Sequence, residues 1–300
     1  MARTTENEYK PIDLSRMILD PENRIYFISL TLVNKSGALA SFLNILKKHE
    51  FNLVGILSES ISKKEEIEVS MFLETPTKMN LADLEKLIEK EIDMEKIDVV
   101  KKIKIFDHSG WFDEDSFHFP LQVGKVRAVI FPIPVLEGFL VGLRKSLGDE
   151  IVQTIVWYQG REIGKNTLET YRKEYGVEGI NAVEILKKRA LILGWAKMEI
   201  VHLDEKEKKA VIKIFDNWEC DMFKEKSAPQ SHFIRGILSG FFSSLFREDL
   251  KGEETRCIAK GDPYCEFILS ANKNVKEPRK SNDSLAFEES SKGRWVNQYE

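Results

Sequence analysis

The chain has 300 residues, of which 42% are hydrophobic and 31% are charged, and its formal net charge at pH 7 is -4. This length suits two domains of ordinary size, each able to bury its own core. The slight acidic excess gives no overall attraction to nucleic acid, and no basic stripe with interleaved aromatic residues is present. No apolar run reaches the roughly 18 residues that a membrane-spanning helix needs, and residues 1–21 contain no signal-peptide core. We therefore expect a cytoplasmic protein that contacts neither membrane nor nucleic acid.

The first patterned segment, residues 22–107, follows a polar N-terminal extension at residues 1–21. Its apolar residues change between the two-residue repeat of strands and the i, i+3, i+4, i+7 spacing of amphipathic helices. Four strands and two helices are expected, at residues 25–33, 39–49, 53–61, 67–73, 81–88 and 97–106. Their order, βαββαβ, predicts a ferredoxin-like domain.

The turn between the first strand and the first helix carries the pattern Asn-x-x-Gly-x-Leu, formed by Asn34, Gly37 and Leu39. In this fold the pattern resembles the ACT domain, a small-molecule regulatory module. The resemblance implies a homodimer with an amino-acid ligand at Asn34, Gly37, Ala38 and Leu39. Exposed N–H groups at the start of a helix can hold a carboxylate, which fits such a ligand. The alternative is that Gly37 only permits a tight turn.

Residues 108–124 interrupt both periodicities with Gly, Asp and Pro, and predict a linker. Its four aromatic residues are expected to pack it onto a domain, with lipid or partner binding as the alternative; they are Trp111, Phe112, Phe117 and Phe119. Residues 271–300 are rich in Ser, Asn, Lys and Glu and predict a mostly disordered tail.

Residues 125–270 predict a second domain that mixes helices with an antiparallel sheet. Strands are expected at 126–131, 196–203 and 209–215, helices at 134–147, 149–175, 180–193 and 231–246, and a last hairpin around 261–263. Within the long helix, Gly160-x3-Gly164 predicts the close approach of another backbone. The fold class of the chain is therefore α+β.

The C-terminal hairpin carries the spacing Glu254-x2-Cys257-x7-Cys265, and Cys220 precedes the neighbouring helix. Facing strands bring side chains to within about 5 Å, so the two thiolates can meet one cation. Two thiolates, a carboxylate and a fourth ligand suit tetrahedral zinc. The alternative is a core that buries three free cysteines, which are common core residues.

Several motifs across residues 125–270 resemble the 4-vinyl reductase (4VR) domain. They are Tyr158-Gln-Gly160-x3-Gly164, Asn217-Trp-Glu219-Cys220, Gly236-x2-Ser-Gly-Phe-Phe242 and Glu254-x2-Cys257-x3-Gly261-Asp262-x2-Cys265-Glu-Phe267. That family includes sensor modules of aromatic-responsive transcriptional activators, in which a Glu and three Cys bind zinc. The resemblance assigns three of these ligands to Glu254, Cys257 and Cys265, but its fourth Cys falls on Ser231. The fourth ligand would then be Cys220, His232 or water, and we choose Cys220 because thiolate binds zinc best.

The same domain contains aromatic residues that could line a pocket for a small hydrophobic or aromatic molecule, or could simply form core. They are Phe139, Trp157, Trp195, Phe233 and Phe241. No catalytic motif is present, so an enzyme is not expected. We expect a ligand-responsive regulator that signals to a transcriptional or metabolic partner. The alternatives are a scaffold or assembly subunit, and an auxiliary enzyme of tetrapyrrole or aromatic metabolism.

Overall fold

The computed structural model of the chain describes residues 14, 17–19, 24–58, 65–75, 79–106, 112–114, 118–123 and 126–271. The chain divides into two compact units, unit 1 at residues 1–129 and unit 2 at residues 130–300. Within the described residues, every helix is too short or too polar to cross a membrane.

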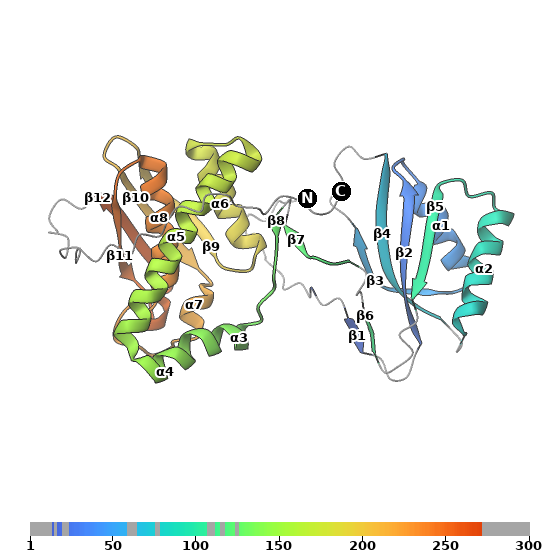
Figure 1. The fold of residues 1–300 in the computed structure, drawn as a ribbon, viewed down its shortest axis with the longest axis horizontal. Coiled ribbons are helices and arrows are strands. Elements are labelled where there is room, and N and C mark those ends of the chain that lie inside the picture. Colours follow the sequence, from blue (N-terminus) through green and yellow to red (C-terminus); the bar gives the residue numbers. More distant parts are fainter. Residues whose placement is uncertain are drawn as a thin grey trace, which may run out of the picture. The chain divides into compact units, whose positions relative to one another are not determined.

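Unit 1 is built on a four-stranded antiparallel sheet with the strand order β3-β4-β2-β5 (Figure 1). Its main elements are β2 (Ile25–Val33), α1 (Ala38–Lys48), β3 (Asn52–Ser58), β4 (Glu66–Glu74), α2 (Leu81–Met94) and β5 (Val100–Phe106). This confirms the predicted βαββαβ order and the ferredoxin-like fold.

The central strand β2 is buried on both faces, which explains why its apolar run is nearly continuous. One face packs against α1 and α2, where Phe42 and Leu84 are fully buried. On the other face, Phe27 forms a small cluster with Ile25 and Phe72. The two helices therefore cover one face of the sheet, while α1 begins at the edge of that layer, directly after β2.

The segments expected to be an N-terminal extension and a linker contain strands, so that part of the sequence prediction is wrong. β1 (Met17–Leu19) pairs antiparallel with β6 (Phe112–Glu114). β7 (Gln122–Val123) pairs with β8 (Val126–Arg127), which is all that forms of the strand expected at 126–131. Turn-forming residues end helices and long strands, yet they leave room for short pairings between segments distant in sequence. Trp111, Phe117 and residues 272–300 lie outside the described residues.

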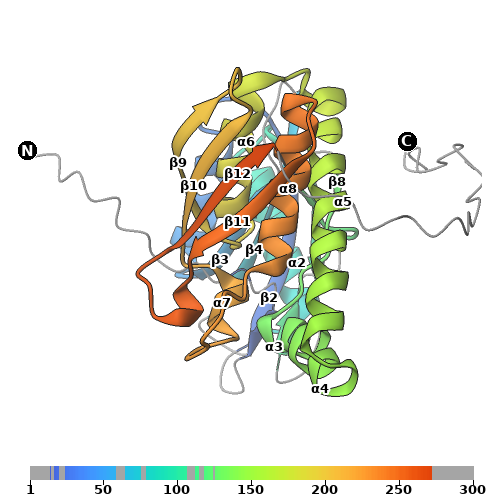
Figure 2. The ribbon, with the colours of Figure 1, turned by 90° about the vertical axis from the view of Figure 1, so that its left-hand side faces the viewer.

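Unit 2 is a second four-stranded antiparallel sheet, with the order β11-β12-β10-β9. Its strands are β9 (Lys197–Asp204), β10 (Lys209–Phe215), β11 (Leu250–Arg256) and β12 (Cys265–Ala271). Its helices are α3 (Ile133–Glu137), a π-helical turn η1 (Gly138–Gly142), α4 (Leu143–Leu147), α5 (Asp149–Tyr175), α6 (Gly179–Ile192), α7 (Trp218–Asp221), α8 (His232–Phe246) and a 3₁₀ turn η2 (Ile258–Lys260). Figure 2 shows α8 lying between this sheet and the long helix α5.

The crossing of α5 and α8 has no room for side chains at four glycines. A Cβ added at Gly164 would lie 2.7 Å from Phe241 N, and one at Gly236 would lie 3.0 Å from Arg161 N. Gly160 and Gly240 meet backbone atoms of the opposite helix in the same way. The predicted close approach at Gly160-x3-Gly164 is confirmed, and its partner is a second Gly-x3-Gly stripe on α8.

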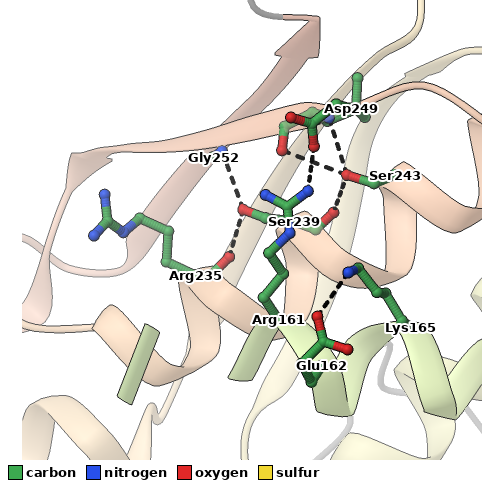
Figure 3. A network of polar contacts seen from close by, with 9 residues as sticks. Arg161, Glu162, Lys165, Arg235, Ser239, Ser243, Asp249 and Gly252 are labelled. Atoms are coloured by element: carbon green, nitrogen blue, oxygen red, sulfur yellow. Dashed lines mark hydrogen bonds and ion pairs between the residues drawn. The ribbon is translucent and has the colours of Figure 1, made fainter. Parts of the chain in front are cut away.

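α8 also satisfies the outer edge of the sheet, because two of its serines bond to β11 (Figure 3). Ser243 Oγ accepts the N–H of Leu250 at 2.9 Å, and Ser239 Oγ accepts the N–H of Gly252 at 3.1 Å. An ion pair between Arg161 and Asp249 lies beside this seam. Since an edge strand otherwise exposes its N–H groups, the serines hold β11 in register with α8.

Candidate metal centre and ligand cavity

Two cysteines of the candidate centre are positioned by the turn between β11 and β12. Gly261 has φ +95°, a conformation that favours glycine, and it ends the η2 turn. Asp262 Oδ2 accepts the N–H of Cys257 at 2.8 Å, which closes the loop. Cys265 then opens β12, and its Sγ accepts the N–H of Ile258 at 3.4 Å. The loop therefore turns both thiols inward.

The four predicted ligands lie together in the structure. Cys220 Sγ lies 3.5 Å from the Sγ atoms of both Cys257 and Cys265, and a carboxylate oxygen of Glu254 completes a set whose atoms are all within 4.8 Å of one another. All three cysteines are free and buried. A tetrahedral zinc with Zn–S bonds of about 2.3 Å would place its sulfur ligands about 3.8 Å apart. The residues present therefore fit zinc in both donor type and spacing.

Ser231, where the family resemblance places a cysteine, lies inside this cluster. Its Oγ donates to Glu254 Oε1 at 2.8 Å and lies 2.9 Å from Cys220 Sγ. Asn217 Nδ2 donates to Ser231 Oγ at 2.9 Å and to Cys265 Sγ at 3.5 Å. The thiol that the helix start lacks is thus supplied from α7 at nearly the same place. His232, the other candidate, is not part of the set that comes together.

The protonation of the cluster is uneven. Hydrogen bonds from Cys220 and then Cys257 lower the pKa of Cys265 to about 4, while hydrogen bonds with Cys257 and then Cys265 raise the pKa of Cys220. Burial, and next the neighbouring Cys257, raises the pKa of Glu254 to about 8. One thiolate is therefore stabilised at neutral pH, and metal binding would release the remaining protons.

Glu219 is a structural part of the site whose role the sequence did not reveal. Its side chain is fully buried and accepts the N–H of Phe233 at 2.9 Å and that of Ile234 at 3.0 Å. Burial raises the pKa of this carboxyl to about 8. Together with Cys220, it fixes α7 against the start of α8. The only sequence signal was its place in the motif Asn217-Trp-Glu219-Cys220.

A cavity of about 570 Å³ borders the cluster and shares Glu254 with it. Its lining comes from α5, the segment before α8, α8 itself and the strands β11 and β12. The lining residues are Gln153, Ala228, Pro229, His232, Arg235, Lys251, Gly252, Glu253, Glu254, Ile268, Ser270 and Ala271. The cavity is therefore largely polar and charged, unlike the apolar pocket that the sequence suggested.

None of the five predicted pocket aromatics lines this cavity. Phe241 is fully buried against Tyr171 and Phe242, and so belongs to the core. Phe139 is 52% exposed, which rules out a place in an enclosed pocket. Trp195 and Phe233 lie with ring centroids 6.2 Å apart, while Trp157 contacts Tyr158. The close α5–α8 crossing explains this outcome, because it leaves no space between the helices for a ligand.

In unit 1 the predicted amino-acid site is an exposed turn. Gly37 has φ +84° and no side chain caps α1. Ala38 N donates to Lys35 O, and Ser41 N donates to Gly37 O, so the N–H groups of Leu39 and Ala40 fall outside the helical ladder. Asn34 is exposed at the end of β2, and its N–H donates to Glu65 O. The Ala38 side chain is buried and Leu39 packs on the core, so these two residues could serve a ligand only through their backbone.

Residues 210–271 match the vinyl-4-reductase (4VR) domain family. This matched segment spans β10 to β12 and contains all four cluster residues. Over 142 residues the chain is 25% identical to the uncharacterized protein MJ0150 of Methanocaldococcus jannaschii, covering 47% of this chain and 76% of that protein. A second uncharacterized protein of this organism, MJ1642, is 24% identical over 143 residues, or 45% and 74% of the two chains.

Solved structures similar to each unit are known. The phenol-responsive sensory domain of the transcription activator PoxR, solved with phenol, is 18% identical with a TM-score of 0.46, over 50% of this chain and 79% of that one. A vinyl-4-reductase family protein from Methanocaldococcus jannaschii is 21% identical with a TM-score of 0.35, over 48% and 83%. The ACT domain from GTP pyrophosphokinase of Chlorobium tepidum is 15% identical with a TM-score of 0.22, over 28% and 99%.

Proposed function

We propose that this chain is a non-enzymatic, ligand-responsive regulator whose unit 2 is held together by zinc. The observation that carries the proposal is the cluster of Cys220, Glu254, Cys257 and Cys265 inside the segment that matches the 4VR family, next to a cavity that shares Glu254. Zinc bound there would join α7, β11 and β12 into one unit. Four protein ligands leave no open coordination position, which is typical of a structural rather than a catalytic zinc.

The cavity gives a route from ligand to protein state. Its wall includes Glu254 and His232, and Glu254 accepts both the N–H and the hydroxyl of Ser231 at the start of α8. A molecule bound there would favour one position of α8 over another, and this differential affinity is what a sensor needs. The output would pass to a transcriptional or metabolic partner.

Native mass spectrometry of the purified protein, with a parallel elemental zinc assay, tests this proposal. We expect one zinc per chain and a co-purified or added small molecule on unit 2. Glu254→Gln should lower the zinc content, whereas the matched control Glu253→Gln should keep it, because Glu253 is exposed and outside the cluster. A protein free of zinc under both purification and reconstitution would contradict the proposal.

For unit 1 we propose an amino-acid ligand whose carboxylate meets the first turn of α1. The support is the ACT-like pattern, the ferredoxin-like fold and the N–H groups of Leu39 and Ala40 outside the helical ladder. Thermal shift with the twenty amino acids tests it. A shift with at least one of them that Gly37→Val abolishes is the expected result. No shift with any would leave Gly37 a turn former only.

We also propose a homodimer, as the ACT resemblance implies. β3 is an edge strand, and four of its apolar side chains are exposed: Leu53, Val54, Ile56 and Leu57. A long apolar edge left open would promote aggregation, so pairing with a second copy is a favourable way to cover it. Sedimentation of wild type and of Ile56→Lys tests this, with a dimer expected for the first and a monomer for the second.

A further inference from the structure

The cavity beside the candidate zinc centre contains an arginine that has no acidic partner. Arg235 extends from α8 alongside β11, away from the Arg161–Asp249 ion pair (Figure 3). Among the described residues, no carboxylate oxygen lies within 4 Å of its guanidinium. The one polar contact it makes there is with His232, whose Nδ1 lies 3.1 Å from Arg235 Nη2.

Burial makes this arrangement costly unless an anion arrives. Burial lowers the pKa of Arg235, with the charges of Glu254 and Glu219 acting against it from a distance. The arginine nevertheless remains charged at every pH of interest, because guanidinium holds its proton so strongly. A partly buried cation with free donors is a general device for binding carboxylates or phosphates in a two-pronged geometry.

The surroundings restrict the ligand further. Gly252 leaves space for the arginine, since a Cβ there would lie 3.2 Å from Arg235 Cγ. Lys251 adds a second cation at the rim and Gln153 a neutral polar group, while Ala228, Pro229 and Ile268 supply apolar wall. A volume of about 570 Å³ is within the range of small-molecule pockets.

We propose that this cavity binds a small organic acid, with its carboxylate on Arg235 and a compact apolar body against Ala228, Pro229 and Ile268. The proposal rests on the ligand-binding role proposed for unit 2 and names its ligand class as anionic. Arg235 is the specificity-determining residue, and an uncharged aromatic molecule of the same shape is rejected because it leaves the guanidinium unpaired.

Benzoate and benzamide are matched probes, because they share one shape and differ in charge. Titrated by ligand-observed NMR and calorimetry into the zinc-containing full chain, benzoate should bind at least about tenfold more tightly than benzamide. Arg235→Gln should weaken benzoate by about tenfold or more and leave benzamide unchanged. Arg189→Gln, which removes an arginine of α6 outside the cavity, should change neither.

Three results would overturn the proposal. Equal binding of benzoate and benzamide, or no binding of either to the zinc-loaded protein, would contradict an acid site while leaving the zinc proposal intact. Binding of inorganic phosphate in place of benzoate would assign the arginine to an inorganic anion. A drop in zinc content in Arg235→Gln would show that the arginine serves as the counter-charge of the thiolate cluster.

Discussion

The two units bury polar groups in different ways. Unit 1 buries few: Ser29, Ser70, Thr75 and Glu91. Unit 2 buries more, and most of them lie around α8: Arg144, Asn217, Glu219, Gln230, Ser231, Ser239 and Ser243. Each of the α8 contacts satisfies a specific N–H, carboxylate or thiol, as a buried polar group requires.

This difference indicates where the specialised chemistry of the chain lies. In unit 1 the candidate ligand groups are backbone N–H groups on an exposed turn, and the core beneath is apolar. In unit 2 the candidate centre is itself part of the core, so its polar network and its fold depend on each other. Perturbing the centre should therefore unfold unit 2, whereas perturbing the turn should barely affect unit 1.

Metal removal should give the largest effect. We expect Cys257→Ser, or chelation of zinc, to destabilise unit 2 by about 4 kcal/mol where free zinc exceeds its dissociation constant roughly 1,000-fold. Amide hydrogen exchange read separately for the two units measures it, and the unit 1 peptides serve as the internal control. Equal loss of protection in both units would contradict the separation of their stabilities.

The glycine crossing of unit 2 should be nearly as sensitive. Gly164→Ala should lower the free energy of unfolding by about 3 kcal/mol, because the new methyl group meets the backbone of α8. The matched control is Gly142→Ala, at a helical position with open space, which should stabilise by about 0.5–1 kcal/mol. Denaturant unfolding measures both, and a neutral Gly164→Ala would disprove the close crossing.

A pH effect of about 2 kcal/mol should come from Tyr171 of α5. Burial raises the pKa of this phenol from 10.0 to about 12, so folding favours the neutral form. Its contribution is complete below pH 10 and is lost as the pH rises through about 12, since the unfolded chain releases the proton first. Comparing the unfolding free energy of wild type and Tyr171→Phe across this range isolates the effect. Parallel curves for the two proteins would contradict it.

The turn of unit 1 should give the smallest effect. Gly37→Ala should cost about 1 kcal/mol, because φ at this residue is +84° although the space around it is open. Ser36→Ala, at an adjacent exposed position with an ordinary φ, should change stability by less than about 0.5 kcal/mol. Thermal unfolding of unit 1 compares the two, and equal stability would remove the strain argument.

The sequence predicted the elements that depend on local pattern. The long helix at 149–175 and the strand at 209–215 have the expected bounds, since apolar periodicity and Gly148 and Gly176 mark them. The spacing of Glu254, Cys257 and Cys265 predicted their meeting because one hairpin contains all three.

Features that depend on distant segments could not be predicted in this way. Pairing of β1 with β6 joins segments far apart in the sequence and leaves no periodic signal. The cavity takes its lining from several separate stretches of chain, so no single motif announces its polar character. The aromatic residues were ambiguous between pocket and core, and the α5–α8 glycine stripes decided for core at Phe241.

The zinc coordination sphere is the most direct test of the central claim, that Cys220 replaces the cysteine missing at position 231. X-ray absorption at the zinc edge should show three sulfur ligands at about 2.3 Å and one oxygen at about 2.0–2.2 Å in the wild type. Cys220→Ser should reduce the sulfur number to two, and the double variant Cys220→Ser/Ser231→Cys should restore three. Three sulfur ligands retained in Cys220→Ser, or no bound zinc in any of these proteins, would contradict the account.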